Sequence, residues 1–283
     1  MTQAWEITSM RMRHSVAQAL YAAVSLRGYR PTLNCQQCPS SRIREDVRVQ
    51  WAYLARMDSA HKYTISAFDS KRCAEFLTGT AGAPPRRELL MGITHAESVA
   101  PRRALDIGCG PGKEIVALLQ AGFDVVAFDP YQDMLDRARS KVDFAFDGRR
   151  PALELHLATL EDFAQRIEPH GFGLVHAGFV LPFVLPQSFP EVFTRVLEGI
   201  APGGVLVAQF FGPDDEFVRN AAPNTMTSQG EEEVSRLLSG LDILHREEVN
   251  RAGAVGRGVN KWWHVHHVIA RMRSMPTRAC MHG

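Results

Sequence analysis

The sequence has few cysteines, almost no net charge and no long apolar run. Its five cysteines are scattered over 283 residues, unlike the dense disulfide framework of small secreted domains. The formal net charge of +1 produces no basic field that would attract a nucleic acid or a membrane surface. No apolar stretch approaches the ~20 residues that cross a bilayer. We therefore expect a cytoplasmic protein that uses neither a membrane nor a nucleic acid.

Acidic residues are absent from residues 7–44, where arginines flank an alanine-rich stretch. Such a composition is typical of an organellar transit peptide. It also fits a short amphipathic helix packed on the domain, or sequence upstream of the true start, because several later methionines could initiate the chain. For residues 1–56 we favour upstream sequence of this kind or a poorly ordered extension, and we keep organellar targeting by residues 1–44 as the alternative.

The most informative stretch is ALDIGCGPGK at residues 104–113. An apolar run that contains Asp106 is followed by glycines at 108, 110 and 112, and then by an apolar helical pattern. The pattern predicts a strand, a glycine turn and a helix. Such a turn brings backbone N–H groups and a helix N-terminus against an anionic part of a ligand.

A second apolar stretch, residues 123–128, ends in Asp129. An acid at the tip of the second strand of a doubly wound sheet can accept hydrogen bonds from ribose hydroxyls. The sequence therefore predicts a cofactor that contains a nucleoside.

The spacing of the glycines distinguishes between two kinds of cofactor. The dinucleotide fingerprint is G-x-G-x-x-G, but Gly112 comes one position too early and Lys113 occupies the place of the third glycine. Asp106 would suit the α-ammonium of a methionine better than a pyrophosphate. The pattern D-x-G-x-G-x-G together with Asp129 resembles the cofactor site of class I S-adenosylmethionine-dependent methyltransferases, and this resemblance implies S-adenosyl-L-methionine as the cofactor.

Further stretches resemble the tellurite-resistance-type small-molecule methyltransferases. They are PPR at 84–86, LEDF at 160–163, FGLVHAGFVLPF at 172–183, the stretch from PGG at 202–204 to FFG at 210–212 with DEF at 215–217, and KWWHVHHVIA at 261–270, and the resemblance covers about residues 80–270. The chain departs from the pattern of that group at Gly178, where serine is expected, at His176, where tyrosine or asparagine is common, and at Phe217, where tryptophan is common.

The resemblance implies a role for each motif residue. Asp106 would hold the methionine ammonium, and Asp129 would take the ribose hydroxyls. Pro130 and Leu160 would flank the adenine, with Glu161 near its amino edge, although Glu161 could simply begin a helix. Backbone of the turn would face methionine and ribose, and the tip of the fourth strand would lie beside the methyl group. The expected cofactor-binding residues are Asp106, Gly108, Cys109, Gly110, Gly112, Asp129, Pro130, Leu160, Glu161, Ala177 and Gly178.

No catalytic base is evident in the sequence. A methyl group on a sulfonium is already activated, so positioning carries much of the catalysis, whereas hard nucleophiles also need a base. His176, at the end of the fourth strand, is the nearest candidate base, and Arg86 could hold an anionic substrate. The competing interpretations are a packed histidine and a solvated arginine at a helix start. A nucleophilic role for Cys109 is not expected.

Metal and nucleic-acid sites are not expected. Cys35 and Cys38 have the spacing of half a zinc site, but a structural site needs four ligands and no second pair lies nearby. His264 and His267 fall on opposite faces of a strand, so we predict no metal. The chain has neither an Asp/Asn-Pro-Pro-aromatic motif after the fourth strand nor a Pro-Cys dipeptide, which argues against methylation of nucleic-acid bases.

Strands and helices alternate from residue 101 onward, which indicates a mainly parallel, doubly wound sheet. With the resemblance, this predicts an α/β, Rossmann-like, seven-stranded sheet with helices on both faces and an antiparallel last strand. A turn is expected at residues 202–204, and Ser228 with Glu231 predicts a capping box. Strands are expected at 103–107, 123–128, 152–157, 172–177, 205–211, 241–249 and 261–270, and helices at 112–121, 131–142, 162–168, 188–199 and 229–239.

We therefore predict an S-adenosylmethionine-dependent methyltransferase that acts on a small-molecule nucleophile by in-line displacement. Its domain would span residues 57–272, with cofactor motifs at 104–183 and a tail at 273–283. The acceptor could be a chalcogen oxyanion, a thiol, or an oxygen or nitrogen of a metabolite. The alternatives are a protein that binds the cofactor without catalysis and a dinucleotide-dependent oxidoreductase.

Overall fold

The structure is a computed structural model that describes residues 82–149, 151–255 and 260–274. The predicted extension over residues 1–56, with Cys35 and Cys38, lies outside the described residues, as does the tail beyond residue 274.

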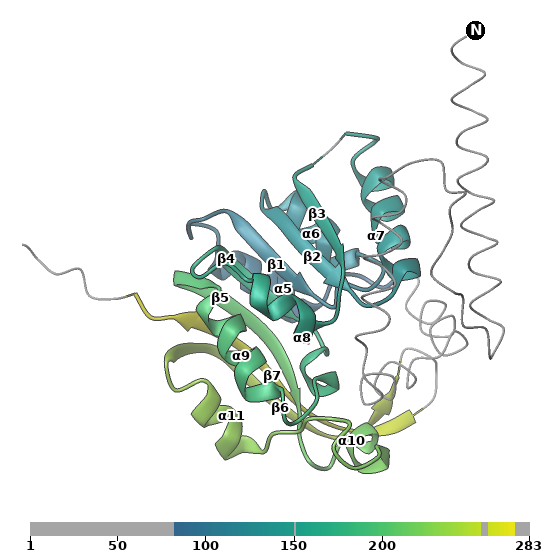
Figure 1. Cartoon of the computed structure of the whole chain (residues 1–283), viewed down its shortest axis with the longest axis vertical. Helices are drawn as coiled ribbons and strands as arrows, with labels where there is room; N and C mark the ends of the chain where they lie inside the picture. The colour runs from purple at the N-terminus through teal and green to yellow at the C-terminus, as the bar shows by residue number, and fades with distance from the viewer. Residues whose placement is uncertain (1–81, 150, 256–259, 275–283) are drawn as a thin grey trace, which may run out of the picture. The chain divides into compact units, whose positions relative to one another are not determined.

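A seven-stranded sheet forms the centre of the described part of the chain (Figure 1). The strands lie in the order β3-β2-β1-β4-β5-β7-β6. The first five pair in parallel, and β7 runs antiparallel to both of its neighbours. The predicted fold class, including the antiparallel last strand, is confirmed. The strands are β1 (Arg103–Ile107), β2 (Asp124–Asp129), β3 (Leu153–Leu157), β4 (Phe172–Ala177), β5 (Ile200–Phe211), β6 (Leu241–Ala254) and β7 (Asn260–Met272).

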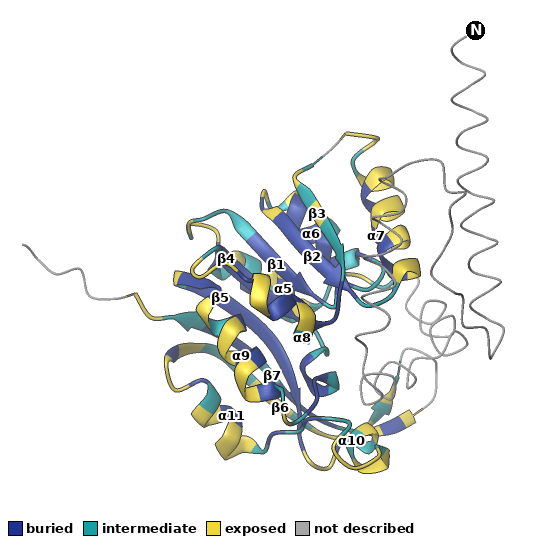
Figure 2. Ribbon diagram, viewed as in Figure 1, coloured by how far each residue is buried: buried dark blue, intermediate teal, exposed yellow. Residues whose placement is uncertain are grey.

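Helices cover both faces of this sheet because its central strands are apolar on both sides. Along β5, Val205 and Val207 pack into one core layer, whereas Leu206 and Ala208 pack into the other. The helices turn their buried side toward the sheet and their exposed side outward (Figure 2). The first layer includes α5 (Arg87–His95), α6 (Lys113–Gln120) and α7 (Gln132–Ala145), and the second includes α8 (Leu160–Phe163), α9 (Phe189–Glu198) and α11 (Glu231–Leu237).

The strand order reverses direction next to β1. The chain moves outward from β1 to β3, then crosses back to place β4 on the other side of β1. The loops after β1 and β4 therefore diverge at the carboxyl edge of the sheet. In open α/β sheets, ligands bind at this switch point, and the glycine turn follows β1 there.

Two local predictions were wrong. Residues 202–204 do not form a turn before the fifth strand, because β5 begins at Ile200 and runs through them. The register of β5 against β4 shifts between Phe172 and Leu174. Gly203 absorbs the irregularity with a φ of 77°. The capping box does not form either: α11 begins at Glu231 with Gly230 as its N-cap and no side-chain cap.

Within the described residues, no helix combines the length and the apolar character needed to cross a membrane.

Candidate active site at the carboxyl edge of the sheet

The glycine turn connects β1 to α6 in a shape that only glycine adopts easily. Gly110 has a φ of 52° and Gly112 a φ of 80°, both in the left-handed region. A Cβ at Gly112 would lie 2.7 Å from the Cα of Ala138 on α7, so the turn packs closely against that helix. A Cβ at Gly110 would meet nothing within 4 Å. The turn is therefore held against α7 at Gly112 and has open space beside Gly110.

Gly108 and Cys109 are fixed by neighbouring strands and loops. A Cβ at Gly108 would lie 2.9 Å from the Cγ2 of Val180, and the Cys109 N–H donates to the Phe128 carbonyl at 3.0 Å. Burial, followed by the charges of Asp106 and Asp129, raises the pKa of the Cys109 thiol well above its ordinary value. The thiol stays protonated, which agrees with the expectation that it is no nucleophile.

Asp129 ties the tip of β2 to the glycine turn. Its carboxylate accepts the Gly110 N–H at 2.9 Å and the Tyr131 N–H at 3.0 Å. Only 6% of the residue is exposed, and this burial raises the pKa of Asp129 to about 6, although the two N–H bonds lower it. A carboxylate offers about four lone-pair sites, so two remain for further donors.

Asp106 and His176 form a buried pair across β1 and β4. The two residues are partners in the parallel register, and a hydrogen bond of 2.7 Å joins Nδ1 of His176 to Oδ1 of Asp106. The second carboxylate oxygen, Oδ2, and the second ring nitrogen, Nε2, are buried without a hydrogen-bond partner. Buried polar atoms rarely remain unpaired, so these two atoms point to a ligand with polar groups.

The ring of His176 fills the space beside Gly178. A Cβ on Gly178 would lie 2.7 Å from Cε1 and 2.8 Å from Nε2 of that ring. The two departures from the family pattern therefore belong together: histidine at 176 leaves no room for a side chain at 178. Ala177, the last residue of β4, is fully buried between them.

The residues after β3 lie beside the tip of β2. The Ala158 N–H donates to the carbonyl of Asp129 at 3.2 Å, which holds the two strand ends together. Leu160 begins α8 and is 4% exposed. The Glu161 carboxylate accepts the Leu185 N–H at 3.3 Å, so Glu161 holds the loop before α9 in addition to any contact with a ligand. Pro130, next to Asp129, is half-buried.

Arg86 and Phe179 lie in contact with each other beside the tip of β4. The guanidinium carbon of Arg86 lies 4.4 Å from the centre of the Phe179 ring, and its Nε lies 3.8 Å from Oε1 of the buried Glu114. Phe179 has a φ of 59°, which a bulky side chain seldom adopts. Its ring is in edge contact with Phe211 and Trp263, both at 5.9 Å.

Comparison with known proteins agrees with this architecture. Residues 104–204 match the family model described as "Methyltransferase domain". Trans-aconitate 2-methyltransferase from Acidovorax sp. (strain JS42) is 30% identical over 133 residues, which are 46% of this chain and 45% of that protein. The chain thus spans about half the length of the curated relatives it matches.

Solved structures share the same fold. TehB from Haemophilus influenzae has a TM-score of 0.54 at 15% identity, covering 71% of this chain and 67% of that chain. The N-methyltransferase NodS from Bradyrhizobium japonicum WM9, in complex with S-adenosyl-L-homocysteine, has a TM-score of 0.54 at 16% identity, covering 74% and 98%. Residues 104–204 thus resemble a methyltransferase domain, and the described chain has the fold of class I methyltransferases.

This fold brings most of the predicted site residues to one edge of the sheet. The Asp129–Gly110, Asp106–His176 and His176–Gly178 contacts link the motifs of β1, β2 and β4. Sequence reasoning missed that Phe179 lies against Arg86 and that Trp263 contacts Phe179. The left-handed conformation of Phe179 has no signature in the sequence, and Trp263 reaches the site only because β7 pairs with β5.

Proposed function

We propose that the protein transfers a methyl group from S-adenosyl-L-methionine to a small-molecule nucleophile. The observation that carries the proposal is the buried Asp106 carboxylate, which uses Oδ1 for His176 and leaves Oδ2 without a partner. It lies at the switch point of the sheet, one strand away from Asp129. An ammonium group would satisfy the free oxygen, and a dinucleotide pyrophosphate would not.

The motif residues would hold the cofactor as follows. The free lone pairs of Asp129 would accept the ribose hydroxyls, and Oδ2 of Asp106 would accept the methionine ammonium, directly or through water. The turn at Gly108, Cys109, Gly110 and Gly112 leaves its open side at Gly110, so that backbone can approach the ligand closely. Pro130, Leu160 and Glu161 would border the adenine, and Ala177 and Gly178 the methyl group.

The bound cofactor supplies a methyl group on an activated sulfonium, and the residues of the chain orient the reactants and exclude water. His176 is a positioning residue in this proposal: its hydrogen bond to Oδ1 fixes the direction of the other carboxylate oxygen. Gly178 keeps the tip of β4 free of side-chain atoms, while Phe179 covers that tip with an aromatic ring.

We further propose that the acceptor is anionic. Arg86 lies beside the tip of β4, because a Cβ on Gly178 would be 3.6 Å from its Nε. About a third of the Arg86 side chain is exposed, so its guanidinium can reach a carboxylate or an oxyanion. The relative named for trans-aconitate supports this choice.

We also propose the limits of the domain and a cytoplasmic location for the protein. The domain would span residues 57–272, since the last strand ends at Met272, with an extension at 1–56 and a tail at 273–283. The sparse cysteines favour the cytoplasm.

Calorimetric titration with S-adenosylhomocysteine tests the cofactor. We expect micromolar binding to the unaltered protein and a loss of at least about tenfold in affinity for Asp129→Ala. Asp124→Ala is the matched control, because Asp124 lies at the other end of β2 and is exposed. If the folded protein does not bind S-adenosylhomocysteine but binds NAD, the proposal is overturned in favour of an oxidoreductase. Tight binding without turnover of carboxylates, thiols, amines, selenite or tellurite would indicate a protein without catalysis.

A further inference from the structure

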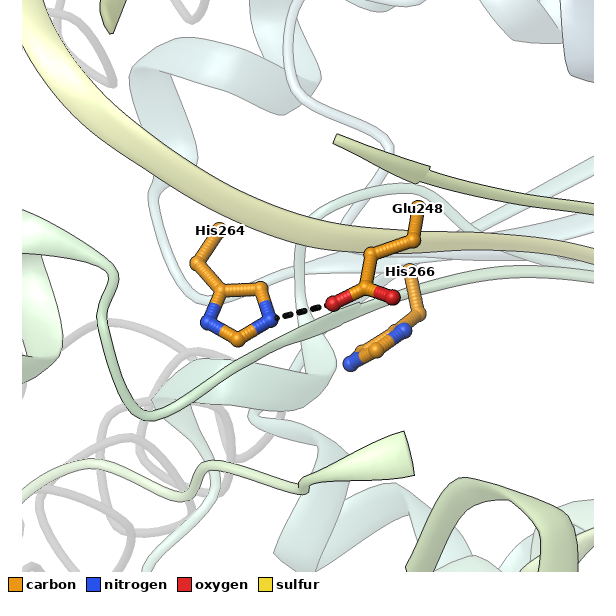
Figure 3. A group of neighbouring side chains, drawn as sticks. All are labelled: Glu248, His264 and His266. Carbon is orange, nitrogen blue, oxygen red and sulfur yellow. Dashed lines mark hydrogen bonds and ion pairs between the residues drawn. The ribbon is translucent and has the colours of Figure 1, made fainter. Parts of the chain in front are cut away.

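The β6–β7 hairpin places three metal-binding side chains on one face. His264 and His266 are two residues apart on β7, so both point to the same side of the strand. Glu248 on β6 is the register partner of His266. One ligand atom from each of the three residues lies within 4.8 Å of the other two, and Figure 3 shows the side chains converging.

His266 has an unusual environment for an imidazole. The residue is 0% exposed, yet neither of its ring nitrogens has a hydrogen-bond partner. A buried imidazole normally uses both nitrogens, so a ligand is the simplest explanation for two unpaired ones. The ring lies next to that of His264, with 5.3 Å between the ring centres.

His264 is held in an orientation that suits a metal ligand. Its Nδ1 accepts the Asp214 N–H at 3.2 Å, and Oδ2 of Asp214 lies 3.4 Å from the same nitrogen. Its Nε2 lies 2.8 Å from Oε1 of Glu248. A side chain at Gly212 would overlap the ring, so the backbone there also fixes its position.

We propose that Glu248, His264 and His266 bind a divalent transition-metal ion, with zinc as the best match. Two imidazole nitrogens and one carboxylate oxygen form a ligand set that zinc accepts, with water as the fourth ligand. Magnesium and calcium prefer sites made entirely of oxygen. A metal on Nε2 of His264 requires the neutral tautomer that carries its proton on Nδ1. The bond from the Asp214 N–H to Nδ1 would then be replaced by donation from Nδ1–H to Oδ2 of Asp214, which lies 3.4 Å away, as outer-shell carboxylates accept from metal-bound histidines.

The ligand atoms of the three side chains lie within 4.8 Å of one another, so they need to move only a little closer together to bind one metal ion. Zinc bonds of about 2.0–2.2 Å in a tetrahedron separate neighbouring ligand atoms by about 3.4 Å. The Glu248 side chain is 43% exposed and can move inward, and the water would enter from its side. The cation nearby, Arg246, is directed toward α11, where it donates to Oγ of Ser235 at 2.8 Å.

Such a site would link three segments of the chain and keep one metal position open to water. It would join β6, β7 and the Gly212–Asp214 segment that follows β5, on the sheet face that also packs α9 and α11. None of its three ligands belongs to the residues proposed to hold the cofactor, so the metal and the cofactor can be tested separately.

Zinc titration of the full-length protein after chelator treatment tests the site. Cys35→Ser and Cys38→Ser should be combined as the background, because thiolates would compete for the metal. We expect one equivalent of zinc, a rise in thermal stability on binding, and selectivity over magnesium. Cobalt should give the absorption of a nitrogen and oxygen site without a thiolate charge-transfer band.

Variants of the three residues show where the metal binds. Glu248→Gln and His266→Ala should each lower zinc affinity at least about 100-fold, and Asp214→Ala about tenfold, in line with loss of an outer-shell partner. His245→Ala is the matched control, because His245 is on the same hairpin but is the register partner of Ile269, on the other face. Glu248 is exposed, so its variant remains informative if His266→Ala fails to fold. Unchanged affinity in Glu248→Gln, or no stoichiometric zinc in the folded background protein, would overturn the proposal. S-adenosylhomocysteine binding should persist in all these variants.

Discussion

The charged form of the Asp129 carboxylate is destabilised by burial. Burial raises its pKa to about 6, even with two backbone N–H donors. An unfolded aspartate titrates near pH 4, so the folded protein binds this proton more tightly than the unfolded chain does. Between about pH 4 and pH 6, the free energy of unfolding therefore falls as the pH rises. The strain is relieved when a ligand donates hydrogen bonds to the charged form.

Affinity for S-adenosylhomocysteine should consequently depend on pH. Ribose hydroxyls favour the ionised carboxylate, and a pKa of about 6 leaves roughly a tenth of the Asp129 carboxyl ionised at pH 5. We expect the dissociation constant at pH 5 to be about tenfold higher than at pH 7, measured by calorimetry. The Asp129→Asn variant, weaker throughout, should lose this dependence. An equally steep dependence in the variant would assign the titration to another group.

His176 and Gly178 compete for the same space, so the histidine ring restricts position 178 to glycine. Gly178→Ser would place Cβ 2.7 Å from the His176 ring, which cannot move without breaking its bond to Asp106. We expect Gly178→Ser to lower the free energy of unfolding by about 1–3 kcal/mol.

The double variant His176→Asn/Gly178→Ser should recover most of this loss, because asparagine frees the space and can still donate to Asp106. Urea unfolding of both single variants and the double variant gives the coupling energy. Additive effects of the two substitutions would show that the residues do not compete for the same space.

At the scale of elements, the sequence pattern predicted the strands whose bounds depend on neighbouring residues alone. The strand before the glycine turn and the fourth strand have the expected bounds, since apolar runs bounded by turn residues leave few alternatives. The start of β5 was missed because Gly203 could end a strand as readily as form a bulge, and pairing with β4 decides between them. The capping box failed for a similar reason: Gly230 is the N-cap of α11, in an extended conformation, so Ser228 lies two residues before the position that caps.

The N-cap of α11 offers a test of that explanation. Gly230 has a φ of −74° and a ψ of 172°, which suit any residue, and an added Cβ meets nothing within 4 Å. We expect Gly230→Ser to raise the free energy of unfolding by about 1 kcal/mol, partly through a side-chain cap and partly through a less flexible unfolded chain. Gly240→Ser, at an equally open position, should give about half of this because it adds no cap. Equal gains from the two would mean that no cap forms.

The histidines of β7 show where sequence reasoning ends. Alternation correctly placed His264 and His267 on opposite faces, because His267 lies toward α5, with its Nδ1 3.8 Å from Oε1 of Glu88. The same alternation puts His266 on the face of His264, but the third ligand candidate, Glu248, comes from another strand. Only the register between β6 and β7 brings it into reach, and register is not written in either strand alone.

At the scale of the whole molecule, the candidate active site is assembled from segments that are distant in the sequence. Arg86 precedes the first strand, Asp129 ends the second, Phe179 follows the fourth and Trp263 belongs to the last. The reversal of strand order at β1 explains why these segments meet at one edge. The cofactor half of the site could be predicted because its motifs are local. The acceptor half could not, because it depends on how loops and the β7 strand pack around Phe179.

Because every proposed site residue lies at or after Arg86, the extension should be dispensable. We expect a chain shortened to residues 57–283 to bind S-adenosylhomocysteine within about twofold of the full-length protein and to unfold at nearly the same temperature. A chain shortened further, to residues 82–283, should lose stability, because we assign residues 57–81 to the domain. Calorimetry and thermal unfolding of the three chains separate these outcomes. If removal of residues 1–56 alone abolishes binding or folding, the domain begins earlier than residue 57, and the acid-poor N-terminus is part of the catalytic unit rather than an appendage to it.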